Sequence, residues 1–369
     1  MFAFSYCIAL TAISISNSLT HIGNHAFQSC KGLKSITIPN SVTHIDNSAF
    51  ENCDSLIAIT IPDSVLQIGE DIFHECDALE YIHVSKGNKT YDSREGCNAI
   101  IHTANNMLIA GCKNTFIPNT VEHIGNCAFS GCEGLANISI PDSVKDIGDD
   151  AFASCSSLIS ISIPESVTHV GKEAFDRCTS LISITIPKSI KKIEDYAFSH
   201  CQALACVTIP DTVTHIGDFA FKSCSDLTHI TLPDSITHIG RYAFSYCRNL
   251  ASIGLPHSIA SIEDGLFCYC LNLPCINIPK SVKQIGQYAF SHCQTLGNIT
   301  IPDSVAHIGM YAFSFCYNLA NVTFLDSVSL IRNRAIYLCN NLTEIHIPAG
   351  SFDKFKKQLP DCEGKFVEE

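Results

Sequence analysis

The chain has 369 residues, of which 46% are hydrophobic and 16% are charged, and its formal net charge is −13 with histidine neutral. This acidic balance argues against nucleic-acid binding, which needs a basic surface that faces the phosphates. No apolar run reaches the roughly 18–20 residues of a membrane-spanning helix, so no membrane span is predicted.

Residues 1–16 superficially resemble the apolar core of a signal peptide. They lack a basic start and a small-residue cleavage site, which such peptides carry. Their apolar residues instead fit the repeat described below, entered midway. We therefore expect an amino-terminal portion to be missing, and we predict no cap at Met1.

A period of 23 residues runs through almost the whole chain, and proline marks it most simply. Of the 14 prolines, 12 hold one position of this repeat: Pro39, Pro62, Pro118, Pro141, Pro164, Pro187, Pro210, Pro233, Pro256, Pro279, Pro302 and Pro348. A period of this length indicates a solenoid, in which each unit covers the hydrophobic face of its neighbour. Stacked arrays of this kind present surfaces and rarely build deep catalytic clefts.

Written from the proline, the repeat reads IPxSVTxIGxxAFxxCxxLxxIxI. Its Leu-x-x-Ile-x-Ile part alternates with period 2, which predicts a half-buried strand in a parallel sheet. The β-branched Ser-Val-Thr-x-Ile part ends in glycine and predicts a second short strand followed by a turn. The Ala-Phe-x-x-Cys part is too short for a full helix and predicts a single 3₁₀ or α turn.

One repeat carries ten extra residues, because Pro62 and Pro118 are 56 residues apart, which is 23 + 33. The irregular region spans about residues 85–117. Turn residues between short apolar runs predict a β-hairpin over residues 95–112 that projects from the array. A functional insertion and a tolerated surface insertion are both open.

The last residues, 348–369, depart from the repeat. Ser351 is a good helix cap, and Phe352, Phe355 and Leu359 fall on one helical face before Pro360. We predict a solenoid over residues 1–347 and a capping helix with a tail over residues 348–369, which covers the last open repeat.

The repeat resembles that of the BspA-like leucine-rich repeat family, found in bacterial and protist surface proteins, over essentially residues 3–347. The resemblance implies an α/β solenoid that is mostly β. Its parallel sheet would line the concave face of a curved, right-handed array, with short strands and 3₁₀ turns on the convex side. It also implies adhesion or protein binding at the cell surface or after secretion, with no catalytic residues and no cofactor.

Cysteine and histidine form ladders, meaning equivalent residues of successive repeats. Of the 21 cysteines, 15 share one apolar position, from Cys7 to Cys362, and we expect reduced core thiols there. Seven histidines precede the inward isoleucine: His21, His44, His123, His169, His215, His238 and His307. Other residue types interrupt this series, which favours a solvated strand face. A metal- or redox-active solenoid that uses these ladders is the alternative.

Outward aromatic residues gather in the carboxy-terminal half and form the candidate partner-binding site. Five precede the Ala-Phe pair, three lie four residues later, and one is nearby: Tyr196, Phe219, Tyr242, Tyr288 and Tyr311; Tyr246, Tyr269 and Phe315; and Tyr317. Exposed tyrosine and phenylalanine often dominate binding interfaces. Self-stacking along the array is the alternative explanation.

These observations predict a non-enzymatic protein that binds host, matrix or cell-surface proteins through its repeat surface. No metal and no cofactor are expected. A structural fragment with no partner of its own is a further alternative.

Overall fold

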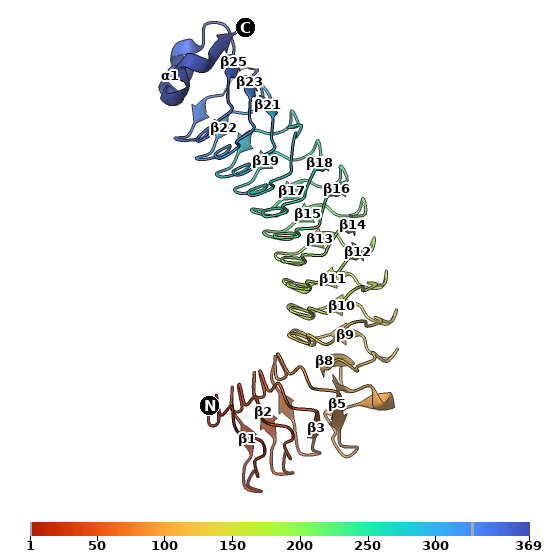
Figure 1. The fold of residues 1–369 in the computed structure, drawn as a ribbon. Helices are drawn as coiled ribbons and strands as arrows, with labels where there is room; N and C mark the ends of the chain where they lie inside the picture. The colour runs from red at the N-terminus through yellow and green to blue at the C-terminus, as the bar shows by residue number, and fades with distance from the viewer. Residues whose placement is uncertain (1, 326–327) are drawn as a thin grey trace. The chain divides into compact units, whose positions relative to one another are not determined.

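The structure is a computed structural model that describes residues 2–325 and 328–369, so the prediction about Met1 lies outside the described residues. Its contacts divide the chain into two compact units, residues 1–181 and 182–369. Within each unit the chain winds through successive similar turns (Figure 1). This division does not test the boundary predicted from the sequence, which separates the solenoid of residues 1–347 from the capping helix and tail of residues 348–369.

The Val-Thr-x-Ile-Gly part of each repeat forms a two-residue strand that pairs in parallel with the strand of the next repeat. The pairing keeps the 23-residue register, so that His21 lies opposite His44 and His215 opposite His238. In the first unit these strands are β1 (His21–Ile22), β2 (His44–Ile45), β4 (Gln67–Ile68), β9 (His123–Ile124), β10 (Asp146–Ile147) and β11 (His169–Val170). In the second they are β13 (Lys192–Ile193), β15 (His215–Ile216), β17 (His238–Ile239), β19 (Ser261–Ile262), β20 (Gln284–Ile285), β22 (His307–Ile308) and β24 (Leu330–Ile331).

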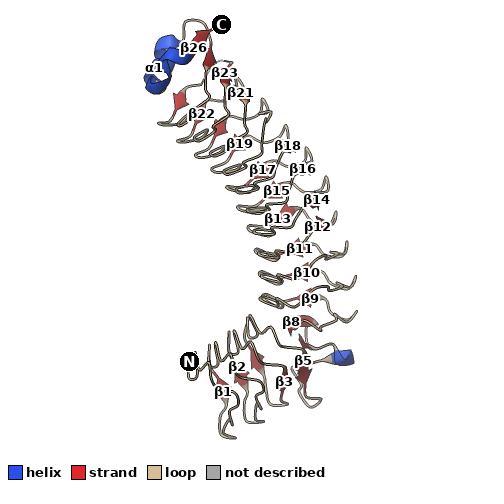
Figure 2. Ribbon diagram, in the orientation of Figure 1, coloured by secondary structure: helices blue, strands red, loops and turns tan. Residues whose placement is uncertain are grey.

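The Leu-x-x-Ile-x-Ile part forms the second series of parallel strands. They are β3 (Ala58–Ile61) and β5 (Tyr81–Val84) in the first unit, and β12 (Ser183–Thr185), β14 (Cys206–Thr208), β16 (His229–Thr231), β18 (Ser252–Gly254), β21 (Asn298–Ile301), β23 (Asn321–Phe324) and β25 (Glu344–Ile347) in the second. Exposed and buried residues alternate along β3, β5 and β21, as expected for half-buried strands. The predicted mostly β solenoid is confirmed, and short strands joined by loops dominate both units (Figure 2).

The Ala-Phe-x-x-Cys part differs from the single 3₁₀ or α turn that its length predicts. Alternate backbone N–H groups donate to the next repeat, as in Tyr242 to Asp264 O at 2.9 Å and Phe244 to Leu266 O at 3.1 Å. The N–H groups between them close local turns, as in Ser245 to Tyr242 O at 3.0 Å. A continuous helix is therefore excluded here, because half of its donors bond to a neighbouring repeat.

Phenylalanine and cysteine form the centre of the core. Phe290 stacks on Phe267 at 5.5 Å and on Phe313 at 5.2 Å between ring centroids, and all three rings are buried. The thiol of Cys293 donates to Phe267 O at 3.3 Å. The corresponding thiols in other repeats make the same bond, which explains why a weak donor occupies this apolar position.

The irregular region holds the antiparallel strands β6 (Tyr91–Asp92), β7 (Ala99–His102) and β8 (Met107–Gly111), with the 3₁₀ segment η1 (Arg94–Gly96) between β6 and β7. The hairpin of β7 and β8 does not project from the array, so that part of the prediction is wrong. Strand β8 pairs in parallel with β9, and Ile100 and Ile101 are fully buried. Leu108 of β8, which lies opposite Ile124, takes the place of a repeat-strand residue, and Ile101 pairs with it from β7.

At the carboxy-terminal end lie α1 (Phe352–Gln358), the 3₁₀ segment η2 (Pro360–Lys365) and β26 (Phe366–Glu368). Phe355 is buried against Phe324, with ring centroids 4.8 Å apart. Ser351 precedes the helix, but its hydroxyl donates to Pro348 O instead of capping. The expected tail forms β26, which pairs in parallel with β25.

Replacement of Phe290 by alanine should lower the free energy of unfolding by about 3–5 kcal/mol, because it removes a fully buried ring with two stacked neighbours. Chemical denaturation followed by circular dichroism measures the change. Replacement of Phe116, which is 45% exposed, is the control and should cost less than about 1 kcal/mol. Equal losses for the two variants would contradict a core that depends on the phenylalanine ladder.

Candidate partner-binding surface

Eight of the nine predicted aromatic residues, all but Tyr317, occupy two backbone positions that both have positive φ. We name the first series row A: Tyr196, Phe219, Tyr242, Tyr288 and Tyr311. Row B lies four residues later and consists of Tyr246, Tyr269, His292 and Phe315. Their φ values lie between 54° and 63°. Large side chains rarely adopt this left-handed conformation, which costs about 1–2 kcal/mol per residue.

Rings of row A stack face to face along the second unit. Tyr196 lies 4.6 Å from Phe219, Phe219 lies 5.2 Å from Tyr242, and Tyr288 lies 5.2 Å from Tyr311, measured between ring centroids. Their interplanar angles are 12° or less. Each aromatic pair contributes about 0.5–1.5 kcal/mol, which is comparable with the backbone strain and offsets it.

Row B forms an unbroken stack of four rings. The centroid distances are 4.5 Å from Tyr246 to Tyr269, 4.0 Å from Tyr269 to His292 and 4.3 Å from His292 to Phe315. Burial in this stack lowers the pKa of His292. The sequence interpretation missed His292, although its spacing of 23 residues from both Tyr269 and Phe315 was a usable signal.

Small residues lie between the two rows and are covered by them. Ser199, Ser245, Ser291 and Ser314 are at most 1% exposed. The nine predicted residues are half-buried except Tyr317, which is 36% exposed and meets Phe315 edge to face at 6.4 Å. The rows therefore pack as a closed layer whose ring edges remain partly accessible. Stacking of the predicted residues is observed, and partner binding stays a prediction.

Arginine and tyrosine extend the surface beyond Tyr311. The guanidinium of Arg334 donates to the Tyr311 hydroxyl at 2.9 Å and lies 5.2 Å from the Tyr337 ring centroid. Tyr337 meets both Tyr311 and Phe315 edge to face, at 6.2 and 5.9 Å. Aromatic and arginine side chains thus join the ends of rows A and B.

An open groove of about 510 Å³ runs beside row A. Glu263, Gly286, Gly309 and Arg332 hold one repeat position along it, so the groove has a carboxylate at one end and a guanidinium at the other. Met310, which directly precedes Tyr311, also lines it and is 39% exposed. The groove adjoins row A in sequence, because its lining residues Gln287 and Met310 directly precede Tyr288 and Tyr311.

In the first unit the positions equivalent to row A hold mixed residue types, among which Asp71, Asp150 and Glu173 are acidic. Burial, followed by the charges of Glu173, Asp149, Asp71 and Asp176, raises the pKa of Asp150 to about 6. Burial also raises the pKa of Asp71. The two units therefore present chemically different surfaces on equivalent backbone positions.

The cysteine and histidine ladders do not assemble a metal site. Among residues 2–325 and 328–369, no group of three or more histidine, cysteine or acidic residues has a suitable arrangement. The 21 cysteines all lie among the described residues and none forms a disulfide bond, and burial raises the pKa of Cys247 to about 12, so its thiol stays protonated. His21 stacks on His44 at 4.3 Å, with each ring also bonded to a neighbouring threonine hydroxyl.

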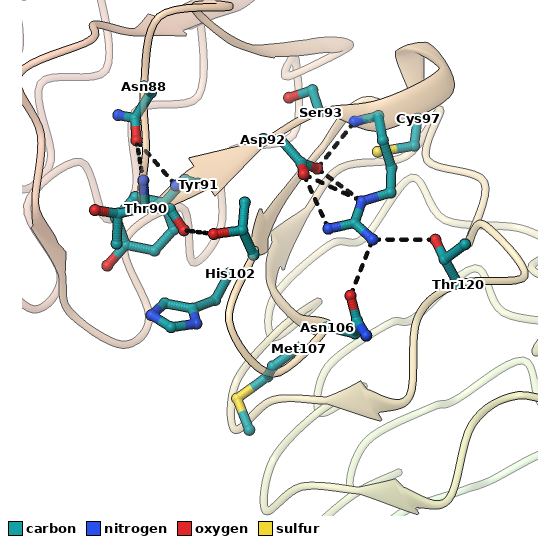
Figure 3. A network of polar contacts seen from close by, with 12 residues as sticks. Asn88, Thr90, Tyr91, Asp92, Ser93, Cys97, His102, Asn106, Met107 and Thr120 are labelled. Atoms are coloured by element: carbon teal, nitrogen blue, oxygen red, sulfur yellow. Dashed lines mark hydrogen bonds and ion pairs between the residues drawn. The ribbon is translucent and has the colours of Figure 1, made fainter.

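The insertion is held by an internal polar network (Figure 3). The Arg94 guanidinium donates to both carboxylate oxygens of Asp92 and to the side chains of Asn106 and Thr120. The Asn88 side chain donates to Pro62 O and Val65 O and accepts from two backbone N–H groups. These bonds tie the insertion to its flanking repeats and support a structural role for it.

Stacked parallel repeats with a cysteine and phenylalanine core define a solenoid protein of the leucine-rich repeat class. The family profile described as "BspA type Leucine rich repeat region" matches residues 1–105, 109–228, 168–297 and 260–359, in six copies. The chain belongs to this family.

Solved structures of bacterial leucine-rich repeat proteins are similar. One from Bacteroides ovatus is 26% identical, with a TM-score of 0.56 over 97% of this chain and 94% of the other. A leucine-rich cell surface protein from Faecalibacterium prausnitzii is 24% identical, with a TM-score of 0.42 over 86% of each chain. No curated protein matches the chain at a significant level. No helix of the described residues is long and apolar enough to cross a membrane.

Replacement of Asp150 by asparagine should raise the melting temperature at pH 7.5. The pKa of Asp150 rises from 3.8 to about 6 on folding, so its stabilising contribution is present below pH 3.8 and is lost as the pH rises through 6. Near pH 4 the two proteins should therefore melt at more similar temperatures. If asparagine raised the melting temperature by the same amount at both pH values, the charge of the Asp150 carboxylate would not be the cause of the increase.

Only exposed thiols should react quickly with a disulfide reagent at pH 8 in the native protein. Cys7, Cys206 and Cys275 are exposed, whereas burial raises the pKa of Cys30 to about 11 and that of Cys247 to about 12. The remaining thiols should react after denaturation, and absorbance of the released thiolate counts them. If most thiols of the native protein reacted rapidly, the cysteines of the ladder would not be buried and protonated as the structure indicates.

Proposed function

We propose that the protein is a non-enzymatic interaction module that binds a protein partner through rows A and B and the adjoining groove. The observation that carries this proposal is the concentration of partly accessible aromatic rings in the second unit. Tyrosine, phenylalanine, methionine and arginine are enriched at protein interfaces, and all four occur on this surface.

The rigidity of the rows supports binding as well as stability. Each ring stacks on at least one neighbouring ring at 4.0–5.2 Å, so part of its side-chain freedom is already lost before association. Ordering of a mobile side chain at an interface costs about 0.5–1.5 kcal/mol. A preordered layer avoids much of this cost.

Leucine-rich repeat domains commonly mediate protein interactions, and members of the BspA-like family are often found at the cell surface. The setting that we propose is therefore adhesion, with a host, matrix or cell-surface protein as the partner. Affinity would come from shallow contacts repeated along the array, which act together. No catalytic step and no cofactor enter this proposal.

The test compares proteins that bind the intact chain with those that bind a variant with Tyr242, Tyr269 and Tyr288 replaced by alanine. Immobilised proteins are exposed to matrix and cell-surface extracts, and retained proteins are quantified by mass spectrometry. A partner that uses the rows should lose at least about tenfold in retention, because hot-spot residues contribute 2 kcal/mol or more.

Replacement of Tyr81, which is 54% exposed in the first unit, is the matched control and should leave retention unchanged. Circular dichroism verifies that each variant folds. If every retained protein binds the triple variant as well as the intact chain, the rows are a stabilising layer and the proposed surface is wrong.

A further inference from the structure

An open groove of about 600 Å³ lies in the first unit, along the Leu-x-x-Ile-x-Ile part of successive repeats. Segments 115–117, 137–141 and 160–162 contribute most of its lining. None of its lining residues is charged, although 16% of all residues are. Its volume is within the range of about 300–1,000 Å³ that is usual for ligand sites. The composition of the groove therefore indicates a neutral ligand.

Phe116 gives the groove one exposed ring. Its neighbours Thr115 and Ile117 are each 7% exposed, whereas Phe116 is 45% exposed. The Thr115 hydroxyl donates to Asn98 O at 2.6 Å and accepts from the Cys112 N–H at 2.8 Å, which ties this segment to the insertion. The insertion thus fixes a phenylalanine whose ring is turned away from the core.

Polar side chains line the groove around this ring. They are exposed, and within the part of the chain that the structure describes they form no hydrogen bond with another protein group: Asn119, Asn137, Ser139, Ser160 and Ser162. By contrast, equivalent amides of the second unit bond to each other, as in Asn321 Nδ2 to Asn298 Oδ1 at 2.9 Å. Amide and hydroxyl groups both donate and accept, so this capacity for hydrogen bonding is open to a ligand.

The ring and the polar groups recur with a regular spacing. One repeat position holds Phe116, Ser139 and Ser162. The position two residues earlier holds Asn137 and Ser160, which pair in parallel. Successive repeats lie about 4.8 Å apart, and alternate residues of an extended chain lie about 7 Å apart. This short grid suits an extended ligand that carries hydroxyl groups at regular intervals.

The lining favours a carbohydrate over other kinds of partner. A phosphate, sulfate or carboxylate group binds best to a cationic side chain, and the groove offers none. Protein interfaces are enriched in tyrosine, methionine and arginine and depleted in serine, which is the reverse of the composition found here. A neutral sugar presents hydroxyl groups that donate and accept, together with an apolar C–H face that packs on an aromatic ring.

We propose that this groove binds a neutral oligosaccharide. One pyranose ring would lie on Phe116, and hydroxyl groups of this sugar and the next would bond to Asn119, to Asn137 and to the serine side chains. Because the groove lies in the first unit and rows A and B lie in the second, this inference does not rest on the proposed protein-binding function.

The test titrates the full chain with the neutral hexasaccharides maltohexaose, cellohexaose, laminarihexaose and N-acetylchitohexaose, and with hexagalacturonate as the charged counterpart. Isothermal titration calorimetry measures binding up to millimolar sugar. At least one neutral hexasaccharide should bind saturably, and hexagalacturonate should bind about tenfold more weakly or less, because its carboxylates find no cationic partner. Absence of saturable binding by every neutral sugar, or equal affinity of hexagalacturonate, overturns the proposal.

Substitutions on the groove locate the site. Phe116→Ala removes the ring and should weaken binding about tenfold, whereas Phe116→Tyr keeps the ring and should bind within about twofold of the intact chain. Asn137→Ala removes one hydrogen-bonding group and should weaken binding about fivefold. Tyr81→Ala, at an exposed aromatic residue of the same unit that does not line the groove, is the matched control and should bind normally.

Circular dichroism verifies that each variant folds. If Phe116→Ala and Asn137→Ala both bind the sugar as tightly as the intact chain, the sugar lies elsewhere and the proposal is wrong. If Phe116→Ala does not fold, Asn137→Ala decides alone.

The proposed function and this inference fail separately. The variant with Tyr242, Tyr269 and Tyr288 replaced should bind the sugar normally, because its changes lie in the second unit. A protein partner held by rows A and B should in turn be retained by Phe116→Ala. If the triple variant lost the sugar, the aromatic rows and not the groove would bind it, and this inference would be wrong.

Discussion

Backbone hydrogen bonding between neighbouring repeats in one constant register is the constraint on which both units depend. Strand pairs such as Ile216 with Ile239 join positions 23 residues apart, and turn bonds such as Phe244 N–H to Leu266 O join residues 22 apart, so both keep the same register. Because the backbone register is the same on every side of the repeat, each side chain must stack on its own equivalent. Phenylalanine therefore meets phenylalanine along most of the array, although single repeats vary, as where Leu266 stands between Ala243 and Ala289 in the core.

The same constraint explains the close approach of the repeats at glycine. A Cβ on Gly240 would lie 2.5 Å from the backbone nitrogen of Asp218 in the preceding repeat. The Asp218 carboxylate in turn accepts from the Arg241 N–H at 2.7 Å. Where the repeat carries this glycine, as at Gly240, the glycine makes room for the neighbouring backbone, and the side chain of Asp218 accepts from a backbone N–H group that lies outside the strands.

Much of this organisation is readable from the sequence because each ladder repeats many times. The proline period, the alternating strands and the apolar cysteine position predict the solenoid, its parallel pairing and its buried thiols. The turns at Tyr242 and Tyr246 were not predictable in the same way, since their left-handed backbone depends on bonds to the next repeat. His292 was not included among the predicted residues because histidine is usually a polar surface residue. In the structure its ring stacks between Tyr269 and Phe315.

The insertion and the tail show a second limit. The two apolar runs around residues 103–106 have the pattern of a free hairpin, yet β8 takes the place of a repeat strand beside β9 and Ile100 and Ile101 of β7 are buried, which only the neighbouring repeats reveal. Likewise β26 follows a helix and carries no repeat signature, but its backbone completes the edge beside β25. Non-local pairing decides both cases, and local pattern carries little information about it.

Left-handed turn positions have a consequence for how such a protein diversifies. The backbone bonds at these positions are made by main-chain atoms alone, so tyrosine, aspartate, glycine, arginine and serine all occur there at the same φ. Point mutation can therefore rewrite the chemistry of this surface, one repeat at a time, while the scaffold beneath stays constant. Duplication of a repeat would likewise lengthen each row by one residue without disturbing those already present.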